Sequence, residues 1–266
     1  MTGDQHRRRF LTTLGAVTAT SLAGCSSGSS TDDQPATTDA TDTATPDDTT
    51  GQSGTDTPGT GERQKDGGET ATTTEPHTVE FESPAGTTVT GTLAGRGDCG
   101  VVFVPQIDLD RESWRPQLER FAAAGHHVLA IDEGERKTAA VRGAVQYLQS
   151  AHGIQQLVLV GASSGGEAVV EAAAAELAVD AVAALSPAGG SDAAGSLDAR
   201  LLVVVSDGDE DRFVRTATDI YEGAAEPKEL VTYDGATHGQ GLFESEHRDR
   251  LRQTLDEFVT TACGDA

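Results

Sequence analysis

Short runs of β-branched and aliphatic residues alternate with longer amphipathic stretches from Thr78 to the end of the chain. Buried strands are predicted at these short runs, which lie at 100–104, 127–131, 157–160, 182–185, 201–205 and 229–233. Helices are predicted between and after them, at 113–124, 136–151, 165–177, 212–225 and 246–260. Period-two alternation over 79–82 and 88–93 predicts a leading antiparallel hairpin. This order of elements predicts one α/β domain, in which helices cover both faces of a mostly parallel sheet.

The stretch 26–76 has no such rhythm and contains no aliphatic or aromatic residue larger than alanine. A segment of this composition cannot bury enough apolar surface to offset the entropy lost on ordering. We therefore expect a disordered tether rich in Thr, Asp, Gly and Ser at 26–76, followed by a single folded domain at 77–263.

The first 25 residues have the layout of an export signal, with a basic start, a short apolar run and a small-residue end. The apolar run at 10–23 is shorter than the roughly 20 residues that a membrane-spanning helix needs. Arg7 and Arg8 resemble a twin-arginine signal, and the segment 22–25 resembles a lipobox that ends in Cys25. We expect export and anchoring to the outer face of the cytoplasmic membrane by a lipid on Cys25. The alternative is an ordinary secretory peptide with a chance cysteine.

Acidic side chains outnumber basic ones by 43 to 19, which gives a formal net charge of −24. Removal of residues 1–24 would take away three arginines and one aspartate, and the net charge would become −26. Such a surface repels nucleic acid and anionic lipid headgroups, so we expect neither as a partner. The acidic, lysine-poor composition resembles secreted proteins of salt-loving archaea, although an ordinary acidic extracellular protein would also fit.

A GxSxG pattern with Ser163 at its centre follows the strand predicted at 157–160 and precedes a predicted helix. A nucleophile on so sharp a turn adopts strained backbone angles, so its neighbours must be small, and Gly161 and Gly165 meet that need. A second match at 24–28 lies at the signal cleavage point with no strand before it. Ser163 is therefore the candidate nucleophile, and the alternative is a glycine-rich turn that only packs a helix closely.

A serine hydroxyl needs a base to take its proton, and in hydrolases with this turn the base follows the serine along the chain. Of the seven histidines, only His238 and His247 lie after Ser163. His247 falls in the charged start of the last predicted helix, where we expect a solvated surface residue. His238 comes directly after the last predicted strand, so we assign it as the general base.

The acid that orients the histidine is expected in the segment 206–211, which follows the strand predicted at 201–205. Asp209 is the preferred candidate because it lies within the loop, just before the next helix. Asp207 is the alternative, while Asp207 and Asp211 also suit turn and helix-start positions.

Cys99 and Cys263 remain as an even pair once Cys25 is assigned to lipid. Disulfides persist outside the cell, so these two could bond if their Cα atoms lie close enough. Neither has a neighbouring histidine along the chain or a CxxC spacing, so no metal site is predicted.

The segments VLVGASSGG, VVVSDGDEDRF and YDGATHGQGLF resemble the signature segments of the α/β-hydrolase superfamily, in particular its lidless, dienelactone-hydrolase-like branch. The resemblance spans about 78–262 and implies a triad of Ser163, Asp209 and His238 without a cofactor. It also implies the backbone N–H of Ser164 as one oxyanion donor. The second donor would be the N–H of Ile107, with that of Gln106 as the alternative. Pro105 and Gln106 stand where the family commonly shows His-Gly.

The short loop at 186–198 leaves no room for a lid, so we expect an open site. An open, acidic site with few aromatic residues suits a small or polar ester rather than a long-chain lipid. The prediction is a monomeric serine hydrolase acting on a small-molecule substrate. A non-catalytic surface-binding lipoprotein, or an acyltransferase or peptidase on the same scaffold, is the alternative.

Overall fold

The computed structural model of the chain describes residues 75–175 and 178–264. The predicted signal peptide at 1–25 and nearly all of the predicted tether at 26–76 lie outside this part. Within it, no helix has both the length and the apolar character to cross a membrane.

One eight-stranded sheet forms the centre of the domain, with the strand order β1-β2-β4-β3-β5-β6-β7-β8. The β1–β2 and β2–β4 pairs are antiparallel, and all the other neighbours are parallel. The predicted fold class, with its N-terminal hairpin and mostly parallel sheet, is confirmed. The strands are β1 (His77–Glu82), β2 (Thr88–Gly95), β3 (Cys99–Val104), β4 (His127–Ile131), β5 (Gln156–Ala162), β6 (Ala181–Leu185), β7 (Arg200–Ser206) and β8 (Lys228–Tyr233).

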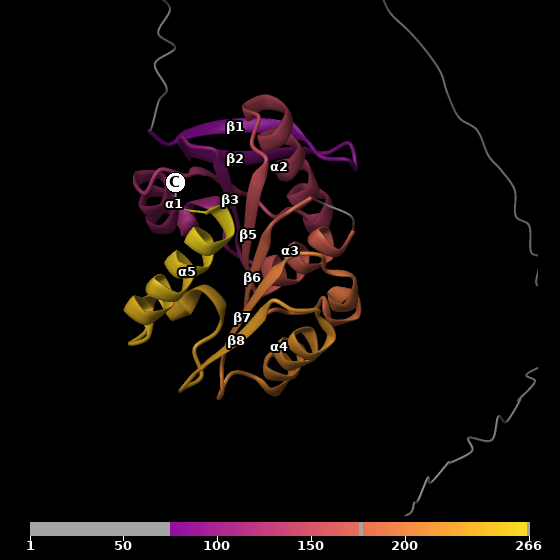
Figure 1. Cartoon of the computed structure of the whole chain (residues 1–266), viewed down its shortest axis with the longest axis vertical. Helices are drawn as coiled ribbons and strands as arrows, with labels where there is room; N and C mark the ends of the chain where they lie inside the picture. Colours follow the sequence, from indigo (N-terminus) through magenta and orange to yellow (C-terminus); the bar gives the residue numbers. More distant parts are fainter. Residues whose placement is uncertain (1–74, 176–177, 265–266) are drawn as a thin grey trace, which may run out of the picture. The chain divides into compact units, whose positions relative to one another are not determined.

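Helices cover both faces of this sheet, as Figure 1 shows. On one face lie α1 (Arg115–Ala123) and α5 (Arg248–Cys263). On the other lie α2 (Lys137–His152), α3 (Ser164–Ala174) and α4 (Asp211–Gly223). Each layer of helices buries its own hydrophobic cluster against the sheet.

The period of two along each strand divides the core between these clusters. In β3, Val102 and Val104 pack toward α2 and α3, whereas Val101 and Phe103 pack toward α1 and α5. All four side chains are fully buried. Strands buried on both faces explain why the sequence shows continuous apolar runs here rather than alternation.

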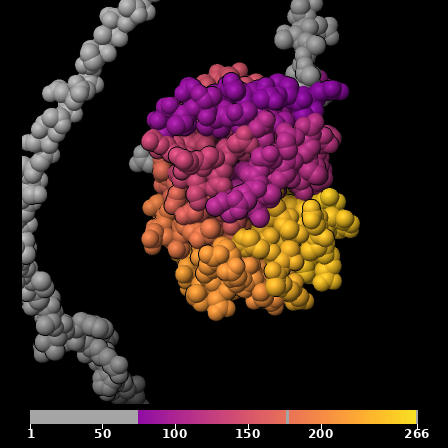
Figure 2. All heavy atoms as spheres, turned by 180° about the vertical axis from the view of Figure 1, so that it is seen from behind, coloured from indigo at the N-terminus to yellow at the C-terminus, as the bar shows by residue number. Residues whose placement is uncertain are grey.

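The parallel strands end at one edge of the sheet, which therefore collects the loops that follow them. Between β6 and β7 the described chain forms only a short 3-10 helix, η2 (Ser191–Ser196), and no lid. Other 3-10 helices follow β3 and β8, namely η1 (Arg111–Trp114) and η3 (Gly239–Glu244). In Figure 2, the magenta surface of the early part of the domain meets the yellow surface of its C-terminal part.

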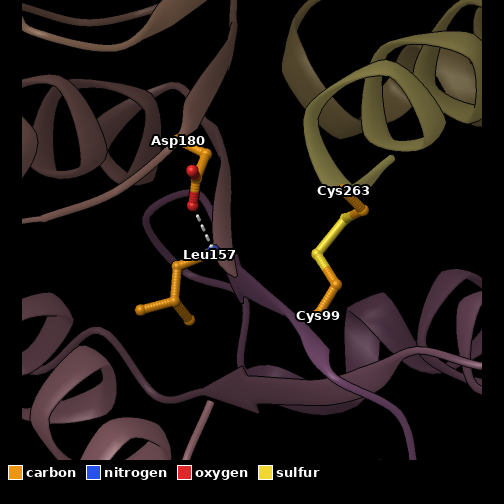
Figure 3. The surroundings of a disulfide bond; sticks show 4 residues. All are labelled: Cys99, Leu157, Asp180 and Cys263. Carbon is orange, nitrogen blue, oxygen red and sulfur yellow. Dashed lines mark hydrogen bonds between the residues drawn. A yellow bond between two sulfur atoms is a disulfide. The ribbon is translucent and has the colours of Figure 1, made fainter. Parts of the chain in front are cut away.

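The opposite edge of the sheet is held by a disulfide between Cys99, at the start of β3, and Cys263, at the end of α5 (Figure 3). Their Cα atoms lie 5.7 Å apart, within the usual range for a disulfide. Nearby, the carboxylate of Asp180 accepts a hydrogen bond of 2.7 Å from the N–H of Leu157. Both contacts stabilise the amino ends of the strands, away from the loops at the other edge.

Candidate active site

Ser163 lies on the sharp turn between β5 and α3, with φ 49° and ψ −114°. A Cβ on Gly161 would collide with the backbone of Gly165, and one on Gly165 with the carbonyl oxygens of Val104 and Pro105. The N–H of Ser163 donates to the carbonyl of Leu185, 2.9 Å away. The turn is therefore both strained and held, and glycine is needed on each side of it.

Asp209 and His238 form a hydrogen-bonded pair across the loops that follow β7 and β8. The Oδ2 atom of Asp209 lies 2.8 Å from Nδ1 of His238. The side chain of Asp209 is 3% exposed and that of His238 is 27% exposed. A buried carboxylate on Nδ1 fixes the ring and leaves Nε2 available as the proton acceptor.

The chain segments next to Ser163 and His238 are in contact. A Cβ placed on Gly239 would lie 3.6 Å from the Cβ of Ala162, so the residues adjoining the serine and the histidine face each other. No hydrogen bond joins Ser163 Oγ to His238 Nε2 within the described residues. Such contacts are often long in free enzymes and shorten when substrate binds.

The other candidates of this region have structural contacts. Asp207 accepts a hydrogen bond of 3.1 Å from the N–H of Gly235, and Asp211 is the exposed first residue of α4. His247 was expected to be solvated, and its side chain is instead half-buried, at 18% exposed. Its ring stacks on Tyr233 at 4.9 Å, and its Nε2 bonds to the carbonyl of Asp234, because the loop after β8 folds back onto the start of α5.

The expected oxyanion donors come from two turns at the same edge. The N–H of Ser164 is the first of α3, and the first N–H groups of a helix have no partner within it. Ile107 is 66% exposed, and its N–H meets no acceptor among the described residues. The N–H of Gln106, the alternative donor, already binds the side-chain oxygen of Gln240 at 3.0 Å. Among the described residues, the N–H of Ile107 is thus unoccupied, whereas that of Gln106 is not.

Glu133 contacts the start of α3 and was not predicted. Its carboxylate accepts a hydrogen bond of 2.9 Å from the hydroxyl of Ser164, and Lys137 Nζ lies 3.6 Å from its other oxygen. Burial raises the pKa of Glu133, although the Ser164 hydroxyl and the Lys137 ammonium oppose that shift. The available signal was its place two residues after the strand at 127–131, because polar residues after parallel strands gather at one edge.

Phe213 contacts the candidate base and was also missed. Its ring centroid lies 4.0 Å from that of His238, and its side chain is buried in the first turn of α4. Phe213 therefore packs against the imidazole and limits its rotation. Its position four residues after Asp209 was the only signal in the sequence.

A group with metal-ligand chemistry lies at the opposite edge of the sheet. Cys99, His126 and Cys263 offer ligand atoms within 4.8 Å of one another. The sequence did not suggest His126, which is distant from both cysteines along the chain. With the two sulfurs joined in a disulfide, this group lacks the thiolates that metal binding requires.

No protein-family model and no curated protein matches this sequence. Solved structures do match its fold. An esterase from Pyrococcus furiosus is 17% identical with a TM-score of 0.59, and the match covers 70% of this chain and 93% of the esterase. The esterase domain of a Rhodothermus marinus protein is 18% identical with a TM-score of 0.60, covering 71% and 100%.

A dienelactone hydrolase from Anabaena variabilis is 21% identical with a TM-score of 0.60, and the match covers 70% of this chain and 97% of that one. At this level of identity the similarity concerns the fold. With its sheet order, its strained serine turn and these neighbours, the chain has the α/β-hydrolase fold.

Proposed function

We propose that the protein is a serine hydrolase that cleaves carboxylic esters or related acyl compounds of small or polar substrates. The observation that carries this proposal is the hydrogen bond between the buried Asp209 carboxylate and the half-buried ring of His238, near the strained turn of Ser163. The esterases and the dienelactone hydrolase that share the fold support a hydrolytic reaction.

In the proposed reaction, Ser163 Oγ attacks the acyl carbon while His238 Nε2 takes the hydroxyl proton. The Nδ1–H of His238 donates to the carboxylate of Asp209, which stabilises the imidazolium. The N–H groups of Ser164 and Ile107 bind the oxyanion of the tetrahedral intermediate. The imidazolium then protonates the leaving alcohol, and a water activated by His238 releases the acid and frees Ser163.

The test is labelling of the full chain with a fluorophosphonate in high salt, beside hydrolysis of short nitrophenyl esters. We expect wild type and Ser150→Ala to label and turn over, because Ser150 lies on the exposed surface of α2. Ser163→Ala should do neither. Equal labelling of wild type and Ser163→Ala would exclude Ser163 as nucleophile, and an inert wild type would favour the binding-protein alternative.

We also propose that the protein is exported through a twin-arginine signal and anchored by a lipid on Cys25. The support is the sequence of residues 7–25, together with a disulfide, which is typical of proteins outside the cytosol. Cys25→Ser should move the protein from the membrane fraction to the medium. Replacement of Arg7 and Arg8 by lysine should keep it inside the cell, and unchanged fractionation of both variants would contradict the proposal.

A further inference from the structure

Two glutamines join the loops that carry the second oxyanion donor and the base. Gln106 follows β3 and Gln240 lies two residues after His238, so they are distant along the chain. The N–H of Gln106 donates to Oε1 of Gln240, and the N–H of Gln240 donates to Oε1 of Gln106, both at 3.0 Å. We call this reciprocal contact between Gln106 and Gln240 the glutamine pair.

The glutamine pair is fixed by further contacts. Nε2 of Gln240 donates to the hydroxyl of Ser113 at 2.9 Å, and that hydroxyl donates to the carbonyl of Asp110 at 2.6 Å. Gln240 is 8% exposed. Because its amide oxygen accepts one hydrogen bond and its amide nitrogen donates another, the buried side chain has one satisfied orientation.

The glutamine pair lies directly beside the candidate catalytic residues. A Cβ on Gly239 would lie 2.6 Å from Oε1 of Gln106, so this oxygen packs against the backbone between His238 and Gln240. The same Cβ would lie 3.6 Å from Ala162, the residue before Ser163. The side chain of Gln106 thus contacts the loop after β8 that carries His238, which we call the base loop. The contact lies where this loop faces the turn of Ser163.

In the loop after β3, which carries the proposed second oxyanion donor, hydrogen bonds use the backbone groups of Gln106 but not the N–H of Ile107. The N–H of Gln106 binds Gln240, and the carbonyl of Gln106 accepts from the N–H of Leu109 at 3.1 Å. Asp108 has a φ of 67°, which closes the turn. The N–H of Ile107 meets no acceptor in the described part of the chain, so it is left for a substrate oxygen.

We propose that Gln106 and Gln240 are positioning residues, which hold the Ile107 N–H and His238 at a fixed distance from Ser163. The proposal rests on the proposed serine hydrolase function. It explains how a loop with Pro105 and Gln106 can supply an oxyanion donor, since the base loop provides the contact that fixes its shape. The Ile107 N–H on one loop and the imidazole of His238 on the other both act in the transition state. The distance between the two loops therefore affects kcat more than substrate binding.

The test compares Gln240→Met with Gln240→Glu in the full chain. Methionine keeps the size of the side chain but leaves the N–H of Gln106 without an acceptor, whereas glutamate keeps an acceptor oxygen. Gln117→Met is the matched control. Gln117 is 4% exposed and, like Gln106 and Gln240, lines a surface cavity of about 640 Å³. Within the described ranges, its side chain makes no hydrogen bond to the loop of Gln106 or to the loop of Gln240.

For nitrophenyl acetate we expect Gln240→Met to lower kcat roughly tenfold to hundredfold, with KM changed less than about twofold. Gln240→Glu should retain most of the activity, and Gln117→Met should match wild type. The ratio of kcat/KM for an ester to that for its thionoester should also fall in Gln240→Met. Sulfur is the poorer hydrogen-bond acceptor, so the thionoester depends less on the oxyanion donor and loses less when that donor is displaced. A purely structural defect would leave this ratio unchanged.

Wild-type kcat in Gln240→Met, or an equal loss in Gln117→Met, would overturn the proposal. If Gln240→Met does not fold, Gln106→Met removes the other half of the glutamine pair. Amide hydrogen exchange at 106–109 gives an activity-free measurement and should be faster in either variant; unchanged exchange contradicts the contact. Failure of the proposed function appears differently, as a wild type that neither labels nor hydrolyses esters.

Discussion

The loop after β7 carries two aspartates whose contacts assign them different roles. Asp209 binds the ring of His238, while Asp207 accepts the N–H of Gly235 and stabilises the start of the next loop. Both aspartates contact the loop that carries His238. Substitution of Asp209 therefore tests the proposed catalytic contact, and substitution of Asp207 tests the stability of that loop.

We predict that Asp209→Asn lowers kcat on the order of 10³-fold to 10⁴-fold, because an amide cannot hold the imidazole in the required tautomer. Asp207→Asn keeps an acceptor for the Gly235 N–H and should stay within about threefold of wild type. The measurement is kcat for a short nitrophenyl ester. A larger loss in Asp207→Asn would assign the acid to that residue instead.

Phe213 restricts His238 through packing alone. We predict that Phe213→Ala lowers kcat roughly tenfold, since a mobile ring spends less time aligned with the serine hydroxyl. Phe213→Leu keeps apolar bulk against the imidazole and should recover part of that loss. Steady-state kinetics of both variants provide the comparison, and wild-type kcat in Phe213→Ala would show that the contact is incidental.

At the scale of elements, the ends of α2, β1 and β4 bring together histidines remote from the candidate site. The rings of His127 and His152 lie 4.6 Å apart, and Tyr147 lies 5.1 Å from His152. Burial lowers the pKa of both histidines. The charge of His152 lowers the pKa of His127 further, and the Gly97 carbonyl partly opposes that shift. The charge of His77 lowers the pKa of both histidines.

A histidine pKa that is lower in the folded state makes stability depend on pH. The unfolded chain binds more protons below its pKa of about 6.5, so the stabilising effect is present above that pH and is lost as the pH falls. We predict that the free energy of unfolding in urea decreases from pH 7.5 to pH 5. His152→Gln should show a shallower decrease, and identical pH profiles would contradict this assignment.

Local pattern predicted the strands and most of the helices to within a few residues, and one helix less well. The strand at 127–131 coincides with β4, because a buried apolar run bounded by polar residues has few alternatives. The helix predicted at 113–124 is instead divided into η1 and α1. Asp110 caps the N–H of Glu112 and Pro116 restarts the helix, and these contacts lie outside the apolar pattern.

The position of the N-terminal hairpin could not be predicted either. β2 pairs with β4 through Gly91 opposite Ile131, a register that depends on how the whole sheet assembles. The candidate site residues were easier to predict. Ser163, Asp209 and His238 each follow a strand, so their order along the chain was sufficient to nominate them. The partners Glu133 and Gln240 belong to contacts between distant segments, which single-sequence patterns do not contain.

At the scale of the whole domain, the disulfide joins positions separated by 164 residues. We predict that the double substitution Cys99→Ser and Cys263→Ser lowers the free energy of unfolding by about 2–4 kcal/mol, chiefly because it frees the unfolded chain. The kcat for ester substrates should not change, since the bond lies at the amino ends of the strands.

Denaturant unfolding with and without reductant measures this effect. Reduced wild type should unfold at the same denaturant concentration as the double variant. Equal stability of the oxidised and reduced proteins would show that the bond does not contribute to stability.

The same bond encloses Ser163, Asp209 and His238 in a closed covalent loop, while β1 and β2 remain outside it. A protease that cut one surface turn between Cys99 and Cys263 would open this loop without detaching any of these three residues. The nicked molecule would keep its mass on a non-reducing gel and fall into two fragments only after reduction. Under the proposed function, the nicked protein would keep its esterase activity, because the disulfide still joins the fragments that carry Ser163, Asp209 and His238.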